Sequence, residues 1–299
     1  SDGNLLAVGT GSDATCLGSN LFRIQLIDLN SNTEDWLSGH DCPVTSLDFN
    51  SDGTKLVSSD SVDLVIIWNT IDKTILKRRE TGIEQSVEWN PDNDVILTQN
   101  EAGILIRDQE FNNISVQGNP NEKITRASWN TQGNKIVYSN SNGVISIWNT
   151  ATNVIEVSLS HHNSAIAALD WNPVNDTIAS ADVDGLINLW DASTGEIVAS
   201  LSTETAIHDL GWSPDGQTLA SAGEDGFVHI WTIQKTYDEI QPTFTEVISF
   251  DYQAAVFALA WSPDGTKLAY GGKGIDGENG QVEIADVSEL PQTTATDNP

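Results

Sequence analysis

The sequence has 299 residues, of which 38% are apolar and 19% are charged. No apolar run approaches the roughly eighteen residues that a membrane-spanning helix needs, so the composition excludes insertion by such a helix. Forty-three Asp and Glu side chains face 13 Lys and Arg, a formal charge of −30. A surface of this sign repels the phosphates of nucleic acids and anionic lipids, which excludes nucleic acid as the main partner.

One short motif recurs along the chain. An apolar stretch ends at an aromatic residue, and a turn of the type Asn/Ser-Pro-Asp-Gly follows. The opening residues 1–7 match residues 51–57, so a further unit begins the chain. Intervals of 40, 40, 42, 41 and 49 residues are typical of a repeat architecture, and they separate the anchor aromatics Phe49, Trp89, Trp129, Trp171, Trp212 and Trp261.

Each unit has the same internal order. A first strand ends at the anchor aromatic, a second follows the turn (218–221), a third usually closes on Trp (186–190), and a more polar fourth (196–201) leads onward. Four short antiparallel strands every forty or so residues predict propeller blades, and no stretch has a sustained helical period. We therefore predict an all-β fold, a seven-bladed β-propeller of four-stranded antiparallel blades over residues 1–287. A Thr/Pro-rich tail or linker is expected over 288–299.

The first blade is predicted to lack its inner strand within this chain. Residues 1–7 correspond to the second strand of the later units, and nothing before them can form a first strand. We expect residues upstream of Ser1 to supply it.

These units resemble WD40 repeats, a family whose marker is Gly-His at the opening of a repeat and Trp-Asp at the end of its third strand. The resemblance covers residues 1–287, and it implies a rigid disc whose loops bind other proteins. The marker has drifted, because only one unit has a literal Trp-Asp. The openings are Gly39-His40 and His161-His162, and the closings are Trp68-Asn69, Arg107-Asp108, Trp148-Asn149, Trp190-Asp191 and Trp231-Thr232.

In the family a His, a Ser or Thr, an Asp and the Trp form a hydrogen-bonded network within a blade. Two blades match three of the four positions. One has Val62 in the Asp position with Asp63 a residue later, and the other has Thr203 in place of the His. Because a buried polar network must be fully paired, we interpret these groups as structural rather than as a catalytic triad. The full set is His162, Ser180, Asp184 and Trp190, and the partial sets are His40, Ser58 and Trp68, and Ser221, Asp225 and Trp231.

The two cysteines lie in connections that a WD40 propeller places on one face. Cys16 follows the second strand of the first blade, and Cys42 precedes the first strand of the second. A disulfide between them would join the two blades and indicate an oxidising compartment. Two unpaired thiols in a cytosolic protein are the alternative. The bridge is the favoured interpretation, and with it an extracellular or periplasmic location.

Two other groups of charged residues have a structural interpretation. Lys73 and Lys77-Arg78-Arg79 fall on a predicted outer strand, where positive charge commonly protects an exposed sheet edge. His208 and Asp209 lie on a predicted inner strand, and Arg126 occupies the repeat position of Asp209. We interpret these three as a solvated channel lining, with an Arg-Asp site for a small polar ligand as the alternative.

The last blade contains the predicted partner-binding residues. Phe250-Asp251-Tyr252 and the turn with Asp276 and Glu278 lie on the side that binds ligands in the family pattern, and exposed aromatics often anchor interfaces. The oxygen-rich turn 276–280 suits Ca²⁺. It lacks the spacing of an EF-hand, and a solvated turn is the favoured interpretation.

The sequence thus predicts a non-catalytic scaffold that binds other proteins, without a cofactor, as part of a larger chain or complex. One alternative is an extracellular structural or glycan-binding propeller, suggested by the acidity, the tail and the two cysteines. The other is a propeller-type hydrolase with a metal held by inner-strand acids or His. The matching positions do not form a metal cage, since they hold Ser46, Ser86, Arg126, Ala168, Asp209 and Ala258.

Overall fold

The structure, a computed structural model, describes residues 5–9, 16, 22–62, 64–80, 86–100, 103–118, 123–234, 242–272 and 280–290. These residues form 26 β-strands arranged in seven antiparallel sheets, which we call blades 1 to 7. The chain divides into two compact units, residues 1–141 with 145–156 and residues 142–144 with 157–299. Within the described ranges, no helix is long and apolar enough to cross a membrane.

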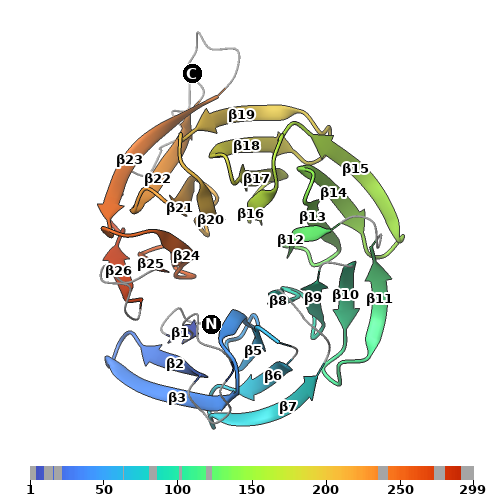
Figure 1. The fold of residues 1–299 in the computed structure, drawn as a ribbon, viewed down its shortest axis with the longest axis vertical. Coiled ribbons are helices and arrows are strands. Elements are labelled where there is room, and N and C mark those ends of the chain that lie inside the picture. The colour runs from blue at the N-terminus through green and yellow to red at the C-terminus, as the bar shows by residue number, and fades with distance from the viewer. Residues whose placement is uncertain are drawn as a thin grey trace, which may run out of the picture. The chain divides into compact units, whose positions relative to one another are not determined.

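The first unit holds blades 1 to 3 and most of blade 4, and in each the strands follow one another in chain order (Figure 1). Blade 1 consists of β1 (Leu5–Gly9), β2 (Phe22–Asp28) and β3 (Thr33–His40). Blade 2 consists of β4 (Val44–Phe49), β5 (Lys55–Asp60), β6 (Leu64–Asn69) and β7 (Thr74–Glu80). Blade 3 consists of β8 (Ser86–Trp89), β9 (Ile96–Asn100), β10 (Gly103–Arg107) and β11 (Asn113–Gln117). Blade 4 consists of β12 (Ile124–Trp129), β13 (Lys135–Asn140), β14 (Val144–Asn149) and β15 (Val154–Ser160).

The second unit holds blades 5 to 7, with the same strand order. Blade 5 consists of β16 (Ile166–Trp171), β17 (Thr177–Asp182), β18 (Leu186–Asp191) and β19 (Ile197–Ser202). Blade 6 consists of β20 (Ile207–Trp212), β21 (Thr218–Gly223), β22 (Phe227–Gln234) and β23 (Thr243–Asp251). Blade 7 consists of β24 (Val256–Trp261), β25 (Lys267–Gly272) and β26 (Val282–Asp286) within the described ranges. The predicted three-stranded first blade is confirmed: β1, β2 and β3 form its sheet.

The strands in the middle of blade 2 are apolar because the neighbouring blades 1 and 3 cover both faces of its sheet. In β6, Ile66 packs in a cluster with Ile24 of blade 1, and the next residue, Ile67, packs with Val87 of blade 3. Side chains alternate across a strand, so a sheet buried on both sides becomes a continuous apolar run. The fourth strand β7 is largely exposed, which explains its polar sequence.

Glycine is required where the turn of one blade touches its neighbour. Gly216, after β20, has a φ of +67°, and a Cβ there would lie 2.5 Å from Asn172 Oδ1 of blade 5. The Asn172 side chain donates to the Gly216 carbonyl at 2.9 Å. Asn90 and Gly133 repeat this contact between blades 3 and 4 at 2.8 Å. The recurring Asn/Ser…Gly turn therefore both reverses the chain and joins blades.

Carboxylates just before the anchor aromatics make a second connection between blades. Asp48 accepts a hydrogen bond from the Trp89 backbone N–H at 2.7 Å, and Asp170 accepts one from the Trp212 N–H at 2.8 Å. Glu88 holds the Trp129 N–H in the same way at 3.2 Å. Burial in these interfaces raises the pKa of Asp48 and of Asp170 to about 7, although their backbone donors oppose the change.

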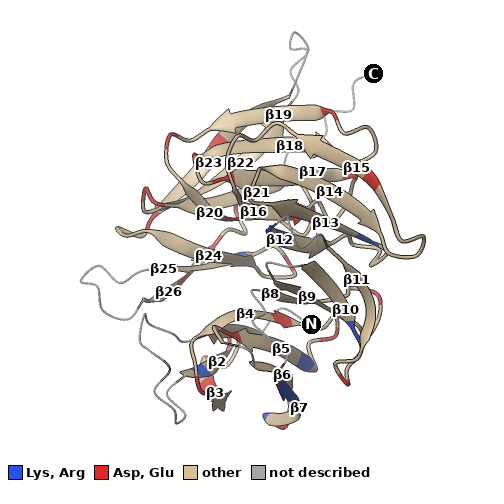
Figure 2. Ribbon diagram, turned by 45° about the vertical axis from the view of Figure 1, so that its right-hand side comes forward, with Lys and Arg blue, Asp and Glu red and all other residues tan. Residues whose placement is uncertain are grey.

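The basic residues of β7 join blade 2 to its neighbours, and Figure 2 shows them in blue on that strand. Lys77 pairs with Glu110 of blade 3, and Arg79 donates to the Phe111 carbonyl at 3.2 Å. On the other side, Arg78 lies 3.5 Å from the carboxylate of Asp41, and Lys73 pairs with Asp35. The cluster therefore makes exposed links from blade to blade.

We expect Lys77→Ala to lower the free energy of unfolding by less than about 1 kcal/mol, because both partners of this pair are partly exposed. Urea unfolding at 0.1 M and 1 M NaCl checks this, and the small difference should shrink at high salt. A loss above about 2 kcal/mol would mean that the pair supports the fold.

Candidate functional site

The polar network of blade 5 connects three strands and the turn between two of them. Trp190 Nε1 donates to Ser180 Oγ at 2.8 Å, and this hydroxyl lies 2.7 Å from His162 Nε2. His162 Nδ1 lies 2.7 Å from Asp182 Oδ2. All four side chains are buried.

The structure corrects the acid of this network, because Asp182 and not Asp184 binds His162. Residues two apart on a strand point to the same face, so β17 places Asp182 beside Ser180. Asp184 lies in the following turn, and its backbone N–H donates to Asp182 Oδ1 at 3.1 Å. The Leu186 N–H donates to the same oxygen at 3.0 Å. Asp182 thus holds both the imidazole and the turn.

The donors around Ser180 assign the proton positions. The Asp182 carboxylate can only accept, so the proton of that contact lies on His162 Nδ1, and Nε2 of the neutral ring accepts the Ser180 hydroxyl proton while the hydroxyl oxygen accepts the indole N–H. Asn188 Nδ2 lies 3.2 Å from His162 Nε2 as a second donor. His162 therefore carries its proton on Nδ1 and donates it to Asp182. Burial lowers the pKa of His162, which favours this neutral form. Because Ser180 is fully buried, its hydroxyl has no access to a substrate.

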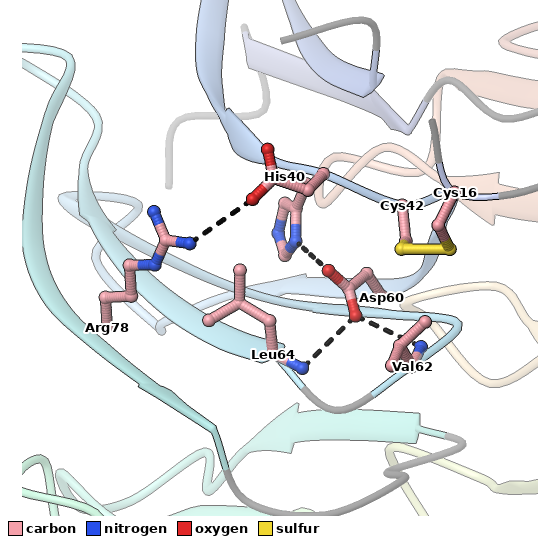
Figure 3. The surroundings of a disulfide bond; sticks show 8 residues. Cys16, His40, Cys42, Asp60, Val62, Leu64 and Arg78 are labelled. Carbon is pink, nitrogen blue, oxygen red and sulfur yellow. Dashed lines mark hydrogen bonds and ion pairs between the residues drawn. A yellow bond between two sulfur atoms is a disulfide. The ribbon is translucent and has the colours of Figure 1, made fainter. Parts of the chain in front are cut away.

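Blade 2 has the same network, shown in part in Figure 3. His40 Nε2 lies 2.7 Å from Ser58 Oγ, which accepts the Trp68 indole N–H at 2.8 Å. Asp60 occupies the fourth role, 3.0 Å from His40 Nδ1, and its other oxygen accepts the N–H groups of Val62 and Leu64. Sequence spacing assigned this role to the position of Val62. The adjacent Asp63 lies outside the described residues.

Blade 6 keeps only the Ser–Trp contact, with Trp231 Nε1 donating to Ser221 Oγ at 2.9 Å. Asp225 does not join it, since its carboxylate lies 3.0 Å from His229 Nε2. His229 Nδ1 lies 2.8 Å from Glu246, and its ring stacks on Trp231 at 5.4 Å. The position of Asp182 is Gly223 in this blade, so no strand carboxylate is present there.

Blade 3 replaces the tryptophan by Arg107, which is buried. Its guanidinium donates to Thr98 Oγ1 at 3.0 Å, to Asn113 Oδ1 at 2.9 Å and to the Phe111 carbonyl at 3.4 Å. A planar group with donors on several sides can reach all three acceptors, whereas an ammonium cannot.

We expect Arg107→Lys to lower the free energy of unfolding by about 2 kcal/mol, because the acceptors on the buried residues Thr98 and Phe111 lose their charge-assisted partners. Arg79→Lys on the exposed strand β7 is the matched control and should change it by less than about 0.5 kcal/mol. Urea unfolding followed by circular dichroism measures both. Equal effects would show that Arg107 is not a structural substitute for Trp.

A disulfide joins Cys16 to Cys42, with 4.8 Å between their Cα atoms (Figure 3). It ties the segment between β1 and β2 to the connection between β3 and β4. Cys42 is buried and lies two residues after His40, so the bridge lies beside the polar network of blade 2.

The inner-strand charges Asp209 and Arg126 belong to different units of the chain, and each is described within its own unit. Asp209 accepts the Leu210 N–H at 2.9 Å and the Leu259 N–H of blade 7 at 2.8 Å, so its carboxylate connects two blades. Arg126 donates to the Thr125 carbonyl and belongs to the other unit. No set of three or more His, Cys, Asp or Glu side chains in the described part of the chain is arranged to hold a metal ion.

The predicted partner-binding aromatics are corrected as well. Tyr252 is only 5% exposed, and its hydroxyl donates to the Gln281 carbonyl at 2.6 Å. Phe250 is partly buried and stacks on Tyr270. Both pack in the core between blades 6 and 7, while Asp251 is exposed. Asp276 and Glu278, with the suggested Ca²⁺ turn, lie outside the described residues.

An exposed aromatic that the sequence interpretation missed is Phe257, at 48% exposure on β24. Its ring lies 4.8 Å from the His208 ring of β20, and His208 Nε2 lies 2.9 Å from Glu224 Oε1. The signal was present, since Phe257 and His208 share one repeat position. That position lies in an apolar strand, where an aromatic is expected in the core.

Comparison with solved structures defines the class of protein. The chain resembles a chain of a mitotic checkpoint complex at 20% identity and a TM-score of 0.76, covering 93% of this chain and 90% of that one. It also resembles the β-propeller domain of Cps50 (Swd1) from Myceliophteria thermophila at 16% identity and a TM-score of 0.78, covering 95% and 94%. These likenesses show the fold, and the protein is a seven-bladed β-propeller.

Three stretches of the chain match the WD40 repeat. The model of the WD domain, G-beta repeat, matches residues 32–69, 154–191 and 195–232. Each matched segment contains the last strand of one blade and the first three strands of the next. No curated protein matches the sequence. The resemblance inferred from Gly39-His40 and Trp190-Asp191 is therefore confirmed.

Proposed function

We propose that this propeller is a non-catalytic scaffold that binds other proteins through its loops. The observation that carries the proposal is that the Ser-His-Asp groups of this protein are buried and hydrogen-bonded within its blades. Both complete sets are buried and each serine oxygen already accepts an indole N–H, so they stabilise blades and do not meet a substrate. The chain also resembles a component of a mitotic checkpoint complex in fold, which is consistent with a role in assembly.

The charge of −30 defines the partner surface that this scaffold suits. Opposite charge speeds the encounter of two proteins and selects the matching partner. A partner with a basic surface therefore fits better than nucleic acid or an anionic membrane.

The test is site-specific crosslinking in native extract, with a photoreactive amino acid at Glu224 on one end of blade 6 and at Val174 on the opposite end of blade 5. We expect one protein neighbour to be captured reproducibly from one end of the blades. Capture of carbohydrate alone, or of nothing, would contradict the scaffold.

A second candidate, an extracellular structural or glycan-binding propeller, is favoured by the Cys16–Cys42 disulfide, because such bonds persist in oxidising compartments. Intact mass of the native protein after alkylation, with and without prior reduction, tests the bond. Two added alkyl groups only after reduction support it, and two added without reduction contradict it.

A further inference from the structure

A β-bulge recurs at the start of the inner strands. In β4, β12, β16, β20 and β24 the pairing with the second strand skips the second residue. A bulged residue is unpaired, and its side chain leaves the regular alternation of the strand. The bulge occurs at the same position in these five strands, while the residue at that position differs. The bulged residues are Thr45, Thr125, Ala167, His208 and Phe257.

In blades 6 and 7 the bulge brings two rings together at the surface. Phe257 and His208 come from adjacent inner strands, with centroids 4.8 Å apart and planes inclined by 49°. Glu224, at the end of the second strand of blade 6, contacts His208 and is 54% exposed. Burying a Phe side chain stabilises a protein by about 2 to 3 kcal/mol. An aromatic that stays half-exposed at a bulged position is therefore a candidate contact for a partner.

The charges of the second unit favour a cation as the group that binds beside Phe257. Residues 157–299 contain 22 Asp and Glu side chains and three Lys, with no Arg. Lys267, the one Lys of these in the described ranges, begins β25 near Trp261, at the end of blade 7 away from Phe257. In the described part of this unit, no Lys or Arg side chain of the protein thus lies at the Phe257 end of the inner strands.

We infer that the patch formed by Phe257, His208 and Glu224 docks a Lys or Arg side chain of a partner protein. The cation would lie over the face of the Phe257 ring and pair with the Glu224 carboxylate, as aromatic faces attract cations and carboxylates bind them. The inference rests on the proposed scaffold function and names the chemistry of its contact.

The test is selection of a random twelve-residue peptide library, displayed on phage, against the full chain. Selected peptides are expected to share a Lys or Arg whose replacement by Gln weakens binding about tenfold. Phe257→Ala and Glu224→Gln should each weaken the same peptides by about five- to tenfold. The matched controls Val174→Ala and Glu196→Gln alter exposed residues elsewhere and should change affinity less than about twofold.

Thermal unfolding of each variant checks that the fold is intact. We expect it to be intact, because the replaced side chains are exposed. Selected peptides that need no basic residue, or that bind Phe257→Ala as tightly as the original chain, would overturn the docking patch but leave the scaffold standing. If neither peptides nor protein crosslinks are obtained, the scaffold function itself fails.

Discussion

Asp182→Ala is expected to lower the free energy of unfolding by about 3 kcal/mol, whereas Asp184→Ala should lower it by less than about 1 kcal/mol. Asp182 is 2% exposed and accepts the His162 N–H and two backbone N–H groups. Its removal leaves one buried and two part-buried donors without their acceptor, and a buried unpaired group costs about 1 to 3 kcal/mol, less where water can enter. Asp184 is exposed, so its side chain can be removed without burying an unpaired group.

Urea unfolding measures the difference between the two variants, and amide hydrogen exchange localises it. Because a chain of seven blades need not unfold in one step, exchange at residues 184–186 is the sharper readout. We expect it to accelerate in Asp182→Ala and to remain nearly unchanged in Asp184→Ala. Equal effects of the two substitutions would mean that the turn residue carries the network after all.

This pair also shows what the sequence alone could provide. The anchor aromatics and their turns predicted seven blades, the three-stranded blade 1 and the order of the strands, because a sheet covered on both faces must repeat the same apolar pattern. The choice of acid could not be made by spacing. Two aspartates flank one turn, and only the strand alternation in the folded blade places Asp182 next to Ser180.

Exposure was harder to predict than topology. Tyr252 and Phe250 were expected at the surface because the family pattern places them on the side that binds ligands, but both pack between blades 6 and 7. Phe257 carried no prediction, because a single aromatic in an apolar strand gives no sign of exposure. Its exposure depends on how β24 pairs and packs, including the bulge in its pairing with β25, and no single strand sequence contains that information.

The second large effect is the dependence of stability on pH. Burial raises the pKa of Asp48 and of Asp170 to about 7, against 3.8 for the free side chain. The folded protein therefore holds these protons to a higher pH than the unfolded chain does. Their contribution is fully present below about pH 4 and is lost as the pH rises to 7. Each residue is expected to account for about 2 to 4 kcal/mol of the loss, allowing for its partial exposure.

Other titrating groups change the free energy of unfolding in other pH ranges or in the opposite direction. The lowered pKa of His162 makes the fold weaker as the pH falls below 6.5, since the unfolded chain then binds the proton more readily. The exposed turn acid Asp264, whose pKa is lowered to about 2, acts only under strongly acidic conditions. Repulsion within a chain of charge −30 also grows as acids ionise. Salt at 0.5 M screens that repulsion but leaves the buried carboxyl groups largely unaffected.

Urea unfolding at pH 5 and pH 8 in 0.5 M NaCl should therefore show a less stable protein at pH 8. Asp48→Asn with Asp170→Asn should flatten this slope, even where the amides lower the absolute stability, because they do not ionise. Asp215→Asn, in an exposed turn after β20, is the matched control and should leave the slope intact. Carbon-13 NMR of labelled aspartates gives the direct measurement, with two carboxyl groups titrating near pH 7. If every aspartate titrates below pH 5, the hydrogen bonds from Trp89 and Trp212 hold charged carboxylates, and the interfaces between blades tolerate negative charge.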